Sequence, residues 1–118
     1  GQEIEPGIPF SYHGGCLPLA HPLKDRAFEA ALAAVRLVPG LCGYVGVDFV
    51  LTDREAFLIE INPRLTTSYI GLRRVLPFNL AQAIWSACRD GILPENFTLA
   101  GPAAFSKDDP HSWGLAEG

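Results

Sequence analysis

The sequence predicts an α+β fold in which an antiparallel sheet carries helices packed on one face. Two apolar segments, 43–52 and 56–62, are rich in β-branched and aromatic residues and flank a short polar turn, which is typical of a β-hairpin. Apolar residues recur with helical spacing over 23–38 and 78–90. With 118 residues, 48% of them hydrophobic, the chain has enough apolar material for one packed domain.

The region before the hairpin divides into an extended part and a helix. Residues 1–22 are rich in Gly and Pro, so we expect extended chain and tight turns there, with one short strand around residues 10–12. The helix 23–38 is stopped by Pro39-Gly40. One stripe of this helix is expected to pack on the sheet: Phe28, Ala31, Leu32 and Val35.

The register of the hairpin follows from its turn. A three-residue loop, 53–55, predicts these facing pairs: Thr52 with Ala56, Val50 with Leu58, Asp48 with Glu60, and Gly46 with Asn62. The opposite face is wholly apolar and is expected to cover the core: Val45, Val47, Phe49, Leu51, Phe57, Ile59 and Ile61.

The C-terminal part holds a second helix and weaker signals. Asn79 lies near the start of the helix 78–90, whose expected spine is Leu80, Ile84 and Cys88. A short strand is predicted at 97–99. We therefore predict one domain over 1–106, followed by a polar tail over 107–118.

Composition excludes several classes of protein. Nine Lys and Arg against thirteen Asp and Glu give a net charge of −4, which argues against a duplex nucleic-acid binder. No apolar run approaches the roughly 18 residues of a membrane span. Three widely spaced cysteines, Cys16, Cys42 and Cys88, are typical of reduced, mostly buried thiols in a cytoplasmic protein.

Two carboxylates interrupt the apolar strands at facing positions. Asp48 and Glu60 would repel each other across the sheet unless a cation lies between them. Asn62 adds an amide oxygen on the same face, and this donor set suits Mg²⁺. An exposed polar face is the commoner role for such a pair, but the combination with Asn62 and Arg64 favours a metal site.

Arg64 leaves the strand with the same orientation as Asn62. Its guanidinium is either the salt-bridge partner of the carboxylates or a fork for phosphate or carboxylate oxygens. The hydroxyl-rich segment 66–68 is expected to bend and to form a polar pocket wall.

These residues resemble the metal-binding end of the ATP-grasp superfamily, in which an acidic strand residue is followed about a dozen residues later by Glu-x-Asn-x-Arg. The matching strings are Gly43-Tyr44-Val45-Gly46-Val47-Asp48-Phe49-Val50 and Glu60-Ile61-Asn62-Pro63-Arg64. The resemblance covers about residues 1–90 and is greatest to a branch that joins small carboxylates to amines. It implies that this chain corresponds to the C-terminal lobe of the grasp domain.

The resemblance also implies roles for single residues. Asp48, Glu60 and Asn62 would bind Mg²⁺ or Mn²⁺, Asn62 and Arg64 would contact ATP as co-substrate, and Arg64 would act on the transferring phosphoryl group or the acyl-phosphate. The partners would be ATP, a small carboxylate and an amine. A non-catalytic binding or scaffold module is the alternative, and a metal-dependent hydrolase ranks third.

The sequence departs from the family by lacking its upstream phosphate-binding lysines. Only Lys24 and Lys107 are present, and the chain contains no Met, so we expect a fragment of a larger protein that is inactive alone. Apolar surface left uncovered is expected to drive formation of a homodimer. The segments proposed for that surface are 6–19 and 69–72.

Overall fold

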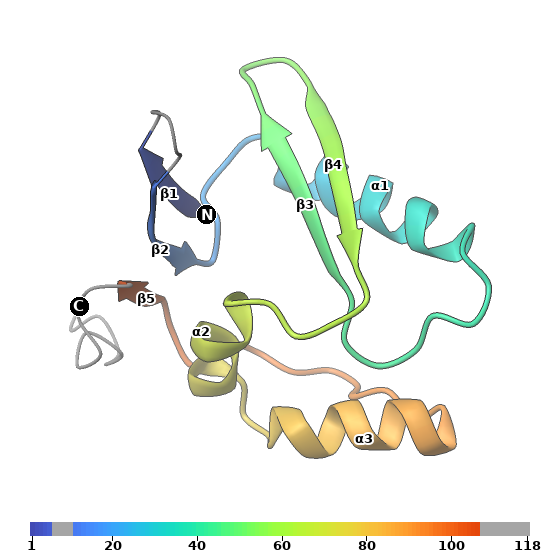
Figure 1. The fold of residues 1–118 in the computed structure, drawn as a ribbon. Coiled ribbons are helices and arrows are strands. Elements are labelled where there is room, and N and C mark those ends of the chain that lie inside the picture. Colours follow the sequence, from blue (N-terminus) through green and yellow to red (C-terminus); the bar gives the residue numbers. More distant parts are fainter. Residues whose placement is uncertain (6–10, 107–118) are drawn as a thin grey trace. The chain divides into compact units, whose positions relative to one another are not determined.

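The computed structural model describes residues 1–5 and 11–106 of the chain (Figure 1). The elements are β1 (Gln2–Glu5), β2 (Ser11–Leu17), α1 (Lys24–Arg36), β3 (Gly46–Leu51), β4 (Ala56–Asn62), α2 (Ser68–Val75), α3 (Leu80–Asp90) and β5 (Ala103–Ser106). The α+β class is confirmed. The described strands form two antiparallel sheets, ordered β1-β2-β5 and β3-β4, rather than one.

The chain divides into two compact units. The first contains residues 1–19, 67–82 and the C-terminal part from 94, and the second contains 20–66 and 83–93. Each unit therefore holds one of the two sheets. The expected tail 107–118 and the Pro-rich residues 6–10 lie outside the described residues.

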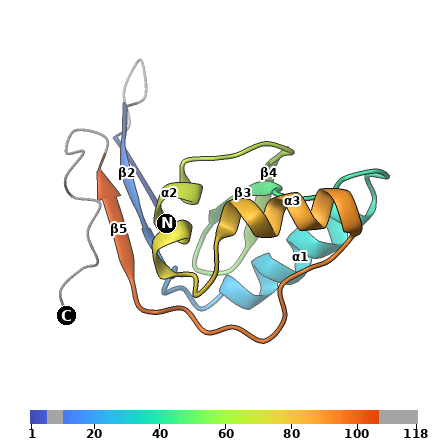
Figure 2. The same cartoon turned by 90° about the horizontal axis from the view of Figure 1, so that it is seen from below.

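In the first unit, α2 packs against β5 and β2 (Figure 2). Gly14 and Gly15 are buried in β2, so the predicted short strand is longer and continues past them. A Cβ on Gly14 would overlap the carbonyl oxygen of Phe105, and one on Gly15 would lie 2.7 Å from the carbonyl oxygen of Gly1. These two glycines are needed because neighbouring backbone approaches β2 so closely.

The helix α2 corrects the predicted bend at 66–68 and the predicted exposed segment 69–72. Gly71 is buried, and its Cα faces the side chains of Leu17 and Phe105. Packing on the sheet therefore overrides the poor helix propensity of a central glycine. Self-association through this segment stays a prediction, but 69–72 is less exposed than predicted, because Gly71 is buried and the other three residues are half-buried.

The predicted strand at 97–99 is also wrong. The C-terminal strand forms later, as β5, where it pairs with β2. The Phe97 ring instead packs edge-on against the Phe78 ring, with 5.2 Å between the centroids. An aromatic contact within the unit thus occupies the side chain that had favoured a strand.

In the second unit, β3 and β4 form a hairpin with a β-bulge, and α1 packs against β4 (Figure 1). Asp48 pairs with Glu60 as predicted, but the next pair is Phe49 with Leu58, which leaves Ile59 as the additional residue. Beyond the bulge the register is shifted by one, so Val50 faces Phe57 and not Leu58. Phe57 therefore lies on the same face as the carboxylates, opposite to its predicted position.

The helix α1 uses a different face from the predicted one. Phe28 is 65% exposed, and Leu32 is also exposed. The half-buried positions are mostly alanines, namely Ala27, Ala31 and Ala34, together with Val35. Small side chains let the helix approach β4 closely, whereas the Phe28 ring would hold the two elements apart.

The helix α3 begins as predicted at an Asn79 cap. The Asn79 Oδ1 accepts a hydrogen bond from the backbone N–H of Gln82 at 3.1 Å. The three cysteines are free thiols, but all three are exposed, so the prediction of mostly buried thiols is wrong. Within the described ranges, none of the helices has the length and apolar character that crossing a membrane requires.

Candidate functional site

The candidate site lies on one face of the β3–β4 hairpin. Asp48 on β3 and Glu60 on β4 are directly paired, and Asn62 is paired with Gly46 at the next position on that face. The bulge follows the Asp48–Glu60 pair, so the predicted register holds throughout the part of the hairpin that carries the site. The prediction that these three polar side chains share one face is confirmed.

The amide of Asn62 joins the two carboxylates. Its Nδ2 donates to Asp48 Oδ2 at 3.1 Å and to Glu60 Oε1 at 2.9 Å. Asn62 is only 8% exposed, so its amide has little contact with water. Because one nitrogen serves both acceptors, the two carboxylates are held within a few ångströms of a common point.

The environment of the pair shifts the pKa values of the two carboxyl groups in opposite directions. Burial raises the pKa of Asp48, and the hydrogen bond and charge of Glu60 raise it further. The hydrogen bond from Asn62 lowers the pKa of Glu60, and the hydrogen bond with Asp48 lowers it further. When the metal-free pair holds one proton, that proton is therefore on Asp48 and the negative charge is on Glu60.

This arrangement makes Asp48 a stability cost at neutral pH in the absence of metal. A carboxyl whose pKa is raised by folding contributes stability below its ordinary pKa of 3.8, and that contribution is lost as the pH rises through the folded-state value. Asn at position 48 imitates the protonated acid. We therefore expect Asp48→Asn to raise the midpoint of thermal unfolding at pH 7 in EDTA, and the difference to vanish below pH 3.8.

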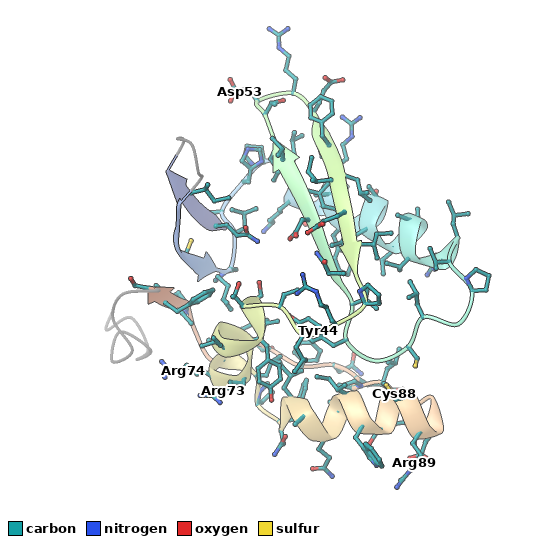
Figure 3. The ribbon with its side chains drawn as sticks, viewed as in Figure 1. Tyr44, Asp53, Arg73, Arg74, Cys88 and Arg89 are labelled. Carbon is teal, nitrogen blue, oxygen red and sulfur yellow. The ribbon has the colours of Figure 1, made fainter. Side chains whose placement is uncertain are left out.

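The matched control for this prediction is Asp53→Asn. Asp53 is exposed in the loop at the end of the same hairpin (Figure 3). It should leave the unfolding midpoint almost unchanged at every pH. A midpoint at pH 7 that is lower in Asp48→Asn than in the unaltered chain would contradict the charge distribution described above.

Arg64 lies immediately beyond the strand and contributes positive charge. Its backbone N–H donates to the Asn62 carbonyl oxygen at 2.8 Å, which turns the chain after β4. Its guanidinium donates to the Leu65 carbonyl oxygen at 3.3 Å, and its charge lowers the pKa of both Asp48 and Glu60. Arg64 is exposed, so its guanidinium remains accessible to an anionic ligand.

A contact between Tyr44 and Thr66 lies at the end of the hairpin that carries Asn62. The hydroxyl groups of Tyr44 (Figure 3) and Thr66 are hydrogen-bonded at 3.0 Å. A Cβ on Gly46 would lie 2.6 Å from the Thr66 Cγ2, so a side chain there would displace Thr66. Sequence reasoning placed Thr66 in a pocket wall and missed its bond to Tyr44. The sequence feature that could have indicated this contact is Gly46, the glycine that faces Asn62.

An apolar pair extends the site beyond the carboxylates. Val50 and Phe57 form the second facing pair past the bulge, and both are exposed. Val50 lies on the same face as Asp48 because the two residues are two positions apart on β3, and Phe57 lies there because it pairs with Val50. Sequence reasoning missed this pair because no residue marks the bulge.

The donor set fits a hard divalent cation. Two carboxylates and one amide supply oxygen ligands, and a half-turn of the Asn62 amide would present its oxygen in place of the nitrogen. In residues 1–5 and 11–106, no group of three or more His, Cys, Asp and Glu side chains is placed to hold a metal. Because the donors that Asp48, Glu60 and Asn62 can offer are all oxygens, this arrangement suits Mg²⁺, which keeps waters and shares phosphate oxygens, better than zinc.

Comparison with known proteins gives a family match and two curated relatives. The family model described as "ATP-grasp domain" matches residues 2–68. The tyramine–L-glutamate ligase of Methanocaldococcus fervens is 50% identical over 60 residues, and that of Methanocaldococcus jannaschii is 47% identical over 60 residues. Each alignment covers 51% of this chain and 20% of the relative. The chain thus spans about a fifth of the length of these relatives.

Solved structures add nothing to the comparison, because none matches the chain significantly. The family match includes Asp48, Glu60, Asn62 and Arg64, which are the residues that form the candidate site. It also includes β1 to β4 and α1. The matched region therefore contains the whole of the hairpin on which the site is built.

Proposed function

Because the chain belongs to the ATP-grasp family, we propose that it is the metal-binding part of an ATP-dependent carboxylate–amine ligase. The observation that supports this most is the shared hydrogen bonding of Asp48 and Glu60 to the amide of Asn62. The charged form of Asp48 is unfavourable in the metal-free chain, and groups with such perturbed pKa values are typical of functional sites. The family match and the named ligase relatives support ATP and an amide-forming reaction.

In this proposal Asp48, Glu60 and Asn62 hold Mg²⁺ or Mn²⁺. When bound, the ion supplies neutralisation of charge on the phosphate oxygens of ATP. Asp48 must lose its proton for this role, and the positive charge of Arg64 assists that loss. Asn62 keeps the two carboxylates oriented toward a common point.

Arg64 is proposed to bind the transferring phosphoryl group. In the reaction, a carboxylate oxygen of the substrate attacks the γ-phosphorus of ATP, and ADP leaves. The amine then attacks the carbonyl carbon of the acyl-phosphate, forms the amide bond and releases phosphate. The exposed guanidinium of Arg64 can present two parallel N–H donors to the oxygens of this phosphoryl group.

The exposed pair Val50 and Phe57 is proposed to contact the nucleotide base. The pair lies on the hairpin face that carries Asp48 and Glu60, and it offers the apolar surface that a base requires. The phosphates of the nucleotide would then lie near Asp48 and Glu60 and its base near Val50 and Phe57. The bound nucleotide would therefore run parallel to β3. Val50 shares this face with Asp48 through the alternation of β3, and the bulge brings Phe57 to the same face.

The substrates proposed for the first assay come from the relatives. Both are named tyramine–L-glutamate ligases, which makes L-glutamate the carboxylate and tyramine the amine to test. We propose that the reaction takes place in the cytoplasm, which accords with three free cysteine thiols.

The test uses the full-length protein that contains this chain, and this chain alone as the second sample. With Mg²⁺, ATP, glutamate and tyramine, the full-length protein should release phosphate only when both substrates are present, and mass spectrometry should detect the amide. This chain alone should form no amide, since it carries the metal ligands without the remainder of the nucleotide site. Amide formation by this chain alone would contradict the assigned division of roles. Failure of the full-length protein with every carboxylate–amine pair would contradict the ligase proposal.

A further inference from the structure

Two of the three cysteines lie beside each other in the second unit. Cys42 is in the loop between α1 and β3, and Cys88 is on α3 (Figure 3). The Cys88 Sγ packs against the backbone of Gly43, the residue after Cys42, so closely that a Cβ on Gly43 would overlap it. Both thiols are free and both residues are exposed. The pair is thus preformed and accessible to a small reagent.

The two thiols also interact directly. A hydrogen bond with the Cys42 thiol raises the pKa of Cys88, because Cys88 keeps its proton as the donor. The raised pKa makes Cys88 the less reactive of the two thiols toward an external electrophile, so the proposed first attack is by Cys42.

The loop that carries Cys42 has room to adjust. Gly40 and Gly43 flank the Leu41-Cys42 dipeptide, with φ angles of +82° and +72°. A Cβ on Gly40 would meet no atom within 4 Å, so this end of the loop is open. The small movement that a sulfur–sulfur bond requires can therefore be made in the loop, without displacing α3.

We propose that Cys42 and Cys88 form a reversible thiol–disulfide site that takes a low-molecular-weight disulfide as its oxidant. The family match over residues 2–68 includes Cys42 but not Cys88, and the proposed ligase chemistry uses neither thiol. The site lies in the loop that leads into β3, the strand that carries Asp48. Oxidation would fasten the start of that strand to α3.

The proposed step is balanced with glutathione disulfide as the oxidant. The Cys42 thiol loses its proton to solvent, and its sulfur attacks one sulfur of glutathione disulfide, which breaks that bond and releases one glutathione thiolate. The Cys88 thiol then loses its proton, and its sulfur attacks the Cys42 sulfur and releases the second glutathione. The two cysteines are oxidised together, and one glutathione disulfide is reduced to two thiols.

The experiment treats the reduced 118-residue chain with glutathione disulfide and maps the products by mass spectrometry after alkylation and digestion. We expect the Cys42–Cys88 link to exceed any link that involves Cys16 by about tenfold or more, because the two sulfurs are already neighbours. Dithiothreitol should restore all three thiols. Cys16→Ser should retain the link, whereas Cys42→Ser and Cys88→Ser should each form only mixed disulfides with glutathione.

Two results would overturn the proposal. The first is an intramolecular disulfide that forms as readily in Cys42→Ser or Cys88→Ser as in the unaltered chain. The second is equal selectivity for the Cys42–Cys88 link in the folded chain and in concentrated urea, which would show that the fold does not create the pair. Because every readout is a thiol product, none of these outcomes depends on the ligase activity.

Discussion

In the full-length protein that contains this chain, Glu60→Gln is expected to lower the kcat of the proposed amide-forming reaction by at least about a hundredfold. The substitution keeps the shape of the side chain and its ability to accept from Asn62, but it removes one of the two negative charges that a cation would meet. Asp48 then remains as the single carboxylate of the site, and one carboxylate binds a divalent cation less tightly than two. The measurement is steady-state amide formation at saturating ATP and Mg²⁺.

Glu55→Gln is the matched control for this prediction. Glu55 is an exposed residue in the loop of the same hairpin, and its backbone carbonyl, rather than its carboxylate, bonds to Thr52. The control should retain nearly the activity of the unaltered enzyme. An unchanged kcat in Glu60→Gln would show that Glu60 is not a metal ligand.

Val75→Ala is expected to destabilise the chain by about 2 kcal/mol. Val75 is the fully buried side chain of the first unit, at 0% exposure, and it lies at the end of α2. Its carbonyl also accepts the Ala100 N–H at 2.7 Å, which joins α2 to the segment before β5. Removing its two methyl groups leaves a cavity, and the hydrogen bond to Ala100 prevents the neighbouring backbone from moving to fill it. Urea unfolding followed by circular dichroism measures the loss.

Leu37→Ala provides the comparison at an exposed site. Leu37 follows α1 and is 83% exposed, so its truncation removes little packing. We expect a change within about 0.5 kcal/mol. If the two substitutions had equal effects, Val75 would not be part of the core of the first unit.

The site was predictable from the sequence because strand alternation is a local property. Asp48 and Glu60 interrupt two apolar strands and pair as predicted. The predicted three-residue turn is wrong, because Leu51 and not Thr52 pairs with Ala56, and the bulge restores the predicted pairing at Asp48 and Glu60. The bulge at Ile59 was not predictable, because inserting one residue leaves the apolar pattern of β4 intact. Its consequence is large, since it moves Phe57 to the face of the site.

In the helices too, features set by the local sequence were predictable, whereas features set by tertiary packing were not. The start of α3 followed from Asn79, whose side chain acts within its own turn. The face of α1 did not, because both an alanine face and a Phe28 face fit helical spacing, and contact with β4 selects the smaller side chains. The helix α2 was missed since Gly71 disfavours a helix locally and is accommodated only by packing against Leu17 and Phe105.

The most direct test of the central claim is a titration of this chain with Mn²⁺, followed by two-dimensional NMR of its backbone amides. Paramagnetic Mn²⁺ broadens the signals of nuclei close to it. We expect residues 46–50 and 58–64 to broaden first, and we expect Asp48→Asn, but not Asp53→Asn, to abolish this broadening. Broadening that begins elsewhere, or that persists unchanged in Asp48→Asn, would contradict a metal site formed by Asp48, Glu60 and Asn62.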